Sequence, residues 1–155
     1  MRKFVVIVCV LLMFFSTLCA ENSPKVVLDF SAKSASDTWS IGSTKLAQDA
    51  TYTNGTYSIR LASCTSGYYI NLNGADSSSL IFGKAGASLQ LPSFNFVVRK
   101  IVVYGTSQCS ADILFSIFAG EEELKSEGVG CVTPRVFYVP VSYLHPEQSF
   151  VLRVL

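Results

Sequence analysis

A lysine between glycines is the first feature of this sequence that could do chemistry. The stretch LIFGKAGASLQLPSF, residues 80–94, places Gly83-Lys84 after an apolar run, as a phosphate-binding loop does. A Walker loop needs the spacing G-x-x-x-x-G-K-[ST] ahead of a helix, because backbone N–H groups at the helix N-terminus hold the phosphate. Here no glycine stands five residues before Gly83, no Ser or Thr follows Lys84, and the strand-like SLQLP comes next. We therefore interpret Gly83 and Gly86 as turn residues between two strands, and we expect no nucleotide site.

Catalytic groups do not form a recognisable set. His145 is the only histidine, and Pro146 after it favours a turn or an extended segment. A nucleophilic triad needs a histidine beside an activated Ser or Cys, and the chain has no G-x-S-x-G elbow. The acidic residues show no spacing that pairs an acid with a nucleophile, as a glycosidase requires. We expect a protein that is not an enzyme, with a Cys64–His145 dyad left open as an alternative.

Aromatic and polar residues in the first half of the chain could bind a sugar instead. Sugar sites combine aromatic faces, which stack on the ring, with Asn, Asp or Arg side chains that hydrogen-bond to hydroxyls. Tyr69, Asn71 and Asn73 share one face of an expected strand, and a merely solvated sheet face is the alternative. Trp39 lies in the loop-like SDTWSIG, where a core or lid position is equally compatible with the sequence. The candidate ligand-binding residues are Trp39, Tyr68, Tyr69, Asn71, Asn73 and Arg60.

Metal sites have little support in the sequence. One histidine and no C-x-x-C pair make a zinc site unexpected. Loop acids such as Asp37, Asp49 and Asp76 carry the oxygen ligands that calcium prefers, but they form no EF-hand-like pattern. We expect no cofactor and no metal, and structural calcium is an unsupported alternative.

The cysteines divide between the N-terminal segment and the rest of the chain. Cys9 and Cys19 fall in the first twenty residues, which leaves Cys64, Cys109 and Cys131. An exported protein can form disulfides, and Cys109 and Cys131 flank a hairpin-like region, so we expect them to pair. Three buried, reduced cysteines are the alternative.

Short strands are the elements that would position these residues. Period-two runs rich in Val, Ile, Phe and Tyr are separated by Gly, Asn, Ser and Pro, which is typical of strands and turns. Asn54-Gly55 predicts a hairpin between two such runs, and Ala119-Gly120-Glu121 predicts another turn. After it we expect a polar loop or an edge strand over residues 121–126, with a single helical turn as the alternative. Residues 96–104 are apolar on both faces for most of their length, which predicts a central strand. No apolar pattern repeats convincingly at helical spacing, so about eight strands predict an all-β sandwich or jelly roll.

The N-terminus predicts export. A basic pair, an apolar run over residues 4–15 and a more polar exit up to Ala20 have the layout of a secretory signal peptide, residues 1–20. The run is too short to cross a bilayer. We expect cleavage after Ala20 and a single β-sandwich domain over residues 21–155, a length sufficient to bury one core.

Export would place the chain in the medium, in the periplasm or on the outer cell surface. Lipidation at Cys19 is the alternative, although Leu18 stands where a lipoprotein signal usually has a small residue. Without Arg2 and Lys3 the chain has ten basic and eleven acidic residues and no basic patch, so nucleic acid is not an expected partner. No later apolar run reaches membrane length, so no transmembrane segment is expected in the mature chain.

Several segments resemble a family of exported β-sandwich modules from gut Bacteroidetes with a galactose-binding-like jelly-roll fold. They are the Asn54-Gly55 hairpin, the Tyr-rich SGYYINLNG, the FGKAGA segment and LPSFNFVVRKIVVYG, within a similarity that runs from about Val27 to the C-terminus. The resemblance implies the fold and an association with surface glycan handling or adhesion. Related modules usually continue into a further turn and strand, whereas this chain stops at SFVLRVL. We therefore expect a truncated chain or an open edge at the last strand that a partner covers.

These observations predict a non-catalytic, secreted or cell-surface module that binds glycan. The alternative is a structural or adhesive module that contacts a surface protein through an open edge strand.

Overall fold

The computed structural model describes most of the chain after the predicted signal peptide. The described residues are 24–30, 37–42, 48–62, 70–72, 80–82, 85–104, 114–128 and 134–155, with the backbone alone at 70–72 and 80–82. Residues 1–20 lie outside these ranges, and so do Cys64, Cys109 and Cys131. The expected signal peptide and the expected Cys109–Cys131 disulfide therefore remain predictions.

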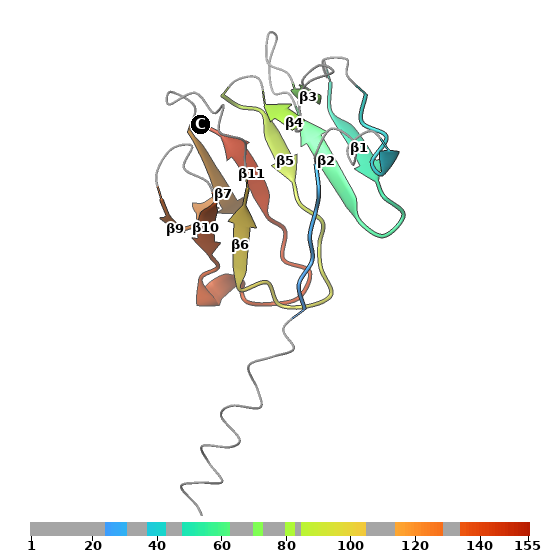
Figure 1. Cartoon of the computed structure of the whole chain (residues 1–155). Coiled ribbons are helices and arrows are strands. Elements are labelled where there is room, and N and C mark those ends of the chain that lie inside the picture. The colour runs from blue at the N-terminus through green and yellow to red at the C-terminus, as the bar shows by residue number, and fades with distance from the viewer. Residues whose placement is uncertain are drawn as a thin grey trace, which may run out of the picture.

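One sheet has six strands, and every pairing in it is antiparallel (Figure 1). In spatial order the strands are β1 (Ala50–Thr53), β2 (Ser58–Ala62), β5 (Ser88–Gln90), β11 (Val151–Val154), β7 (Phe115–Ala119) and β8 (Glu122–Glu123).

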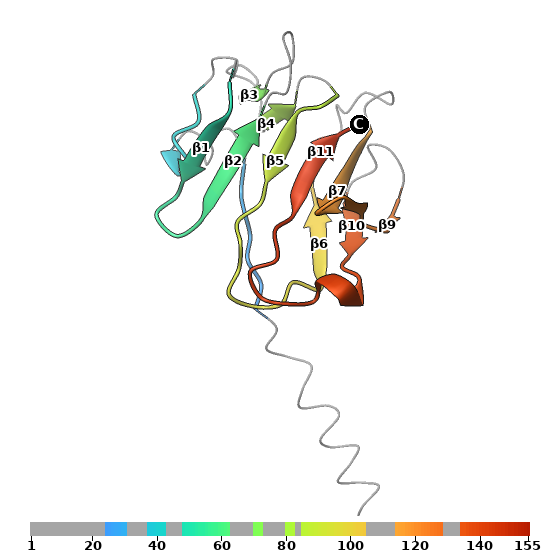
Figure 2. The ribbon, with the colours of Figure 1, turned by 180° about the vertical axis from the view of Figure 1, so that it is seen from behind.

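A second sheet of three antiparallel strands packs over the β11–β7 side of the first (Figure 2). Its strands, in spatial order, are β6 (Lys100–Val103), β10 (Arg135–Tyr138) and β9 (Ser126–Glu127). Outside the two sheets, β3 (Ile70–Leu72) and β4 (Leu80–Phe82) pair with each other, and Val141–Tyr143 form a short 3-10 helix. The prediction of an all-β sandwich is confirmed.

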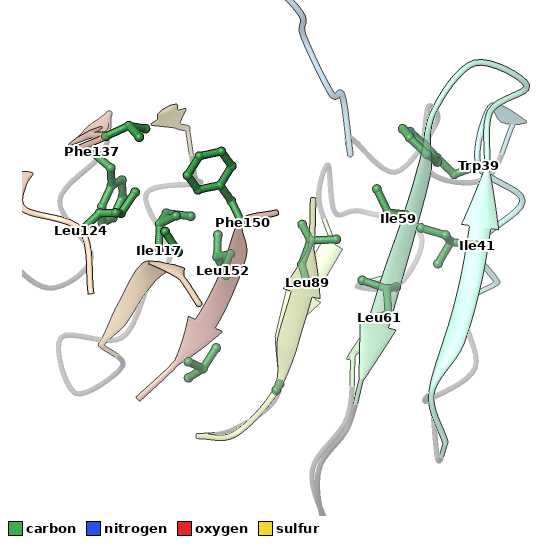
Figure 3. Close-up of a cluster of buried hydrophobic side chains, with 14 residues drawn as sticks. Trp39, Ile41, Ile59, Leu61, Leu89, Ile117, Leu124, Phe137, Phe150 and Leu152 are labelled. Carbon is green, nitrogen blue, oxygen red and sulfur yellow. The ribbon is translucent and has the colours of Figure 1, made fainter. Parts of the chain in front are cut away.

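The core lies on the inner face of the six-stranded sheet, because apolar and polar residues alternate along strands such as β2. The second sheet covers it on one side, and Trp39, Ile41, Leu28 and Phe30 belong to it or pack against it on the other. In β2, Ile59 and Leu61 are each 1% exposed, whereas Arg60 between them faces solvent. Residues on neighbouring strands continue this apolar face, and Figure 3 shows the buried side chains as one series from Trp39 to Phe137. In β2, the neighbours of a side chain that faces the core therefore face solvent, and a surface site can form on that side of the sheet.

The expectation of an open edge at the last strand is wrong. β11 lies inside the six-stranded sheet, with Leu152 opposite Leu89 of β5 on one side and Ile117 of β7 on the other. The order of strands along the chain does not specify their order in an antiparallel sheet, so a C-terminal strand can occupy the centre. Among the described strands, β1 ends this sheet on one side.

The strand predicted over residues 96–104 is shorter in the structure, and it lies at the end of a sheet and not at its centre. Only Lys100–Val103 form β6, which ends the three-stranded sheet as the structure describes it. The aromatic residues before β6 pack instead with one another, since the Phe94 ring lies 5.1 Å from Phe96 and 5.4 Å from Tyr57, centroid to centroid. The run over residues 96–104 is thus apolar on both faces for two reasons: its first residues belong to the connection between the two sheets, and only its later ones form a strand.

Three turns have the conformation that the sequence predicts. Gly55 and Gly86 have φ angles of 88° and 91°, in the left-handed region that favours glycine. Asn54 supports the β1–β2 hairpin, because its Oδ1 accepts hydrogen bonds from the backbone N–H groups of Thr56 and Tyr57 at 3.0 and 2.8 Å. Gly120, with a φ of 60°, makes the expected turn between β7 and β8.

One segment closes the sandwich on the side of β7. Residues 122–123 pair with β7 as β8, and residues 126–127 pair with β10 of the other sheet as β9. Between them, the N–H of Leu124 donates to the Ile117 carbonyl at 2.8 Å, and the carbonyl of Lys125 accepts from the N–H of Tyr138 at 3.0 Å. The polar loop or edge strand expected here is therefore a corner that joins both sheets.

The guanidinium of Arg135 fills the space behind this corner. It donates hydrogen bonds to the Phe115 carbonyl and to Ser126 Oγ, and its Cζ lies 5.0 Å from the ring centroids of both Phe115 and Phe137. Burial lowers the pKa of Arg135, and the nearby carboxylate of Glu123 opposes that shift. Arg135 thus joins β7, β9 and β10 through its charge and its flat faces.

The burial of Phe137 predicts a large loss of stability on truncation. Its side chain is fully buried, and Phe137→Ala is expected to lower the free energy of unfolding by about 3–5 kcal/mol because a cavity remains. Urea denaturation followed by fluorescence measures this change. Val141, which is 86% exposed, gives the control, and Val141→Ala should stay within about 0.5 kcal/mol of the parent.

Removal of the Arg135 side chain is expected to weaken the closed side. Arg135→Ala leaves a backbone carbonyl and a hydroxyl without their donor and uncovers two rings, so unfolding should become easier by about 1–3 kcal/mol. The exposed Arg99 provides the matched control as Arg99→Ala. Equal urea midpoints for the two variants would contradict the structural role of Arg135.

Candidate functional site

The outer face of the six-stranded sheet carries a shallow hollow with a volume of about 220 Å³. It lies on the side of the sheet opposite the core, over β2, β5 and β11. Its lining residues are Asp49, Arg60, Ala62, Ser88, Gln90, Val151 and Arg153. We call these residues the outer hollow.

The strand register explains why the sheet is hollowed at this place. Arg60 stands opposite Gln90, whereas in the next outward-facing row Ala62 stands opposite Ser88, and Ser88 stands opposite Arg153. Outward-facing residues along a strand are two positions apart. The row with the short Ala62 and Ser88 therefore lies next to the row with the longer Arg60 and Gln90. The floor at Ala62 and Ser88 is therefore low, and longer polar side chains rise around it.

Arg60 forms one wall together with Asp49. The guanidinium is ion-paired with the Asp49 carboxylate across the β1–β2 side of the hollow, and the two side chains are 55% and 43% exposed. An exposed ion pair adds little to stability, because water screens it and the side chains lose conformational freedom when they pair. The ion pair instead fixes the orientation of the Arg60 side chain, since Asp49 binds one edge of its guanidinium.

Arg153 forms the opposite wall. Its Cζ lies 4.5 Å from the ring centroid of Phe118, which stands opposite Val151 on β7 and is the diagonal neighbour of Arg153. Stacking of this kind uses the flat face of the guanidinium and leaves its N–H edges available. Within the part of the chain that the structure describes, Arg153 has no carboxylate partner.

Gln90 and Ser88 lie between the two arginines. The Gln90 amide nitrogen donates to Ser149 Oγ at 3.3 Å, which leaves the amide oxygen as an acceptor on the hollow. The Ser88 hydroxyl can both donate and accept. The outer hollow thus offers hydrogen bonds suited to hydroxyl groups and oxyanions, but it contains no pair of nucleophile and base.

The predicted binding residues separate in the structure. Arg60 lies in the outer hollow, whereas Trp39 is 2% exposed, donates from Nε1 to the Asp29 carbonyl at 3.1 Å and packs against Phe30. The Trp39 ring is therefore covered by protein, which agrees with the alternative that Trp39 is a core residue. Trp39 is not part of the outer hollow. Asn71 lies in β3 with only its backbone described. The other three candidates lie outside the described residues: Tyr68, Tyr69 and Asn73.

Sequence reasoning missed Ser88, Gln90 and Arg153. The alternation in SLQ and VLRV places them opposite the buried Leu89 and Leu152, so their solvent-facing direction could have been found. Their position next to Arg60 could not have been predicted, because it depends on which strands pair.

The outer face of the three-stranded sheet is a second exposed surface, with an aromatic residue on it. Tyr138 is 46% exposed and donates from its hydroxyl to Glu127 Oε1 at 2.7 Å, a bond that raises the pKa of Tyr138. Tyr104, just after β6, is 78% exposed. This surface has aromatic faces but no arginine pair and no described hollow.

Other candidate chemistry is not assembled among the described residues. His145 is exposed, and its Nδ1 lies 3.0 Å from the carbonyl of Pro146. No group of three or more His, Cys, Asp or Glu side chains there could hold a metal ion, and Asp49, one of the calcium candidates, is paired with Arg60. In the described ranges no helix is long and apolar enough to span a membrane.

No family model, no curated protein and no solved structure matches this chain.

Ser116 lies beside Arg153 in the same row of the sheet and generates a prediction about stability. It is fully buried, and its Oγ has no hydrogen-bond partner in the described part of the chain. Ser116→Ala removes an unsatisfied hydroxyl, so it is expected to raise the free energy of unfolding by about 1 kcal/mol, measured by urea denaturation. Ser58→Ala, at an exposed position, is the control, and a clear loss of stability in Ser116→Ala alone would contradict the prediction.

Proposed function

We propose that this chain is an exported, non-catalytic β-sandwich module that binds glycan through the outer hollow. The observation that carries the proposal is the placement of two guanidinium groups, an amide and a hydroxyl around one low floor on a sheet surface. These groups satisfy the hydroxyl and ring oxygens of a sugar through directed hydrogen bonds. The lining of the outer hollow offers hydrogen-bonding groups without a nucleophile beside a base, which favours binding over hydrolysis.

A jelly-roll topology of the galactose-binding-like kind is part of this proposal. In support, the chain passes from β5 in one sheet to β6 in the other, returns at β7, and returns again from β10 to β11. Such crossings between two antiparallel sheets are typical of jelly rolls. The resemblance to Bacteroidetes surface modules and the predicted signal peptide support an exported location.

The alternative function is a structural or adhesive module that pairs with a surface protein through an edge strand. β11 cannot serve, because it is paired on both sides. The four residues of β1, the end strand of the described six-stranded sheet, could accept an added strand instead.

A glycan array followed by titration of the positive ligands tests the proposal. Arg60→Ala should weaken binding by about tenfold or more, because charge-assisted hydrogen bonds to the ligand are lost. Gln90→Ala should also weaken it, whereas Arg99→Ala, on an exposed residue outside the hollow, should not. Absence of binding on a broad array, together with concentration-dependent assembly, would refute the glycan proposal and favour the edge-strand alternative.

A further inference from the structure

We infer that the outer hollow selects glycans that carry an anionic oxygen group, either the carboxylate of a uronic acid or a sulfate ester. This inference rests on the proposed function and adds the class of ligand. It follows from the charge of the hollow, from the geometry of its two arginines and from the size of its floor.

The charge of the hollow is unbalanced. Of its seven lining residues, Arg60 and Arg153 are positive and only Asp49 is negative. Asp49 is engaged by Arg60, and Arg153 has no carboxylate partner among the described residues. The hollow therefore has one excess positive charge, on Arg153 at the β11 side. A neutral sugar bound there would supply no counter-charge for it.

The register places the two guanidinium groups on either side of one ligand position. Arg60 and Arg153 are two strands apart and offset by two residues, with Gln90 and Ser88 between them. Strand spacings of about 4.8 Å and a rise of about 3.4 Å per residue give a Cα separation of about 12 Å. A sugar ring over Ser88 can therefore hydrogen-bond to Arg60 and Gln90 while its acidic group meets Arg153.

Arg153 is suited to receive that group because its orientation is already restricted. The Phe118 ring, which is 9% exposed, lies 4.5 Å from the guanidinium Cζ. A guanidinium held by its face directs its N–H fork sideways, and this fork matches two oxygens of a carboxylate. Prior orientation also lowers the entropic cost of binding.

The test compares three oligosaccharides of the same length and linkage: a neutral one, one with uronic acid residues and one with sulfate esters. Calorimetric titration of the parent protein should give at least about tenfold tighter binding for the uronate or the sulfated ligand than for the neutral one. The two acidic ligands distinguish the carboxylate from the sulfate.

Substitutions assign the preference to a residue. Arg153→Gln should bring the acidic ligands to the affinity of the neutral one, and Arg153→Lys, which keeps the charge but loses the fork, should retain part of the preference. Arg99→Gln is the control for charge outside the hollow. A preference that persists in Arg153→Gln would overturn the role of Arg153.

The two proposals fail in different ways. Equal binding of all three ligands that is still lost in Arg60→Ala would overturn the acidic preference and leave the glycan-binding proposal intact. Absence of binding to any of the three and to a broad array would overturn both.

Discussion

The antiparallel pairing of β11 between β5 and β7 is the constraint on which the rest of the structure depends. It joins the C-terminal residues to strands from the middle of the chain, with Leu152 and Val154 turned into the core. Because side chains alternate along a strand, burial of these two residues turns Val151 and Arg153 outward. A shift of one residue in this register would place a guanidinium in the core, so the apolar face and the polar face specify each other.

The outer hollow is a consequence of that register. Its floor is low because Ala62 and Ser88 fall in one row, and its walls are charged because Arg60 and Arg153 fall on either side of β5. None of these residues is unusual by itself. Their arrangement around a single floor provides the site, and rigid strands hold that arrangement more firmly than loops would.

The two sides of the six-stranded sheet end differently. Next to β7 and β8, the corner around Leu124 and the buried Arg135 tie the two sheets together. At the other side, β1 is held by its hairpin with β2, through the Asn54 side chain. The site adjoins the β1 side, since Asp49 precedes β1 and directs Arg60.

The sequence by itself determined the fold class, the turns at Gly55, Gly86 and Gly120, and the direction in which many strand residues point. Each of these depends on local physics, namely period-two alternation, β-branched and aromatic preference, and the tolerance of glycine for a positive φ. Only the tertiary structure decided that the last strand is central, that Trp39 is buried and that Arg60 shares a hollow with Arg153. These features depend on which distant strands pair, and a strand with one apolar and one polar face can pair with any of several similar partners.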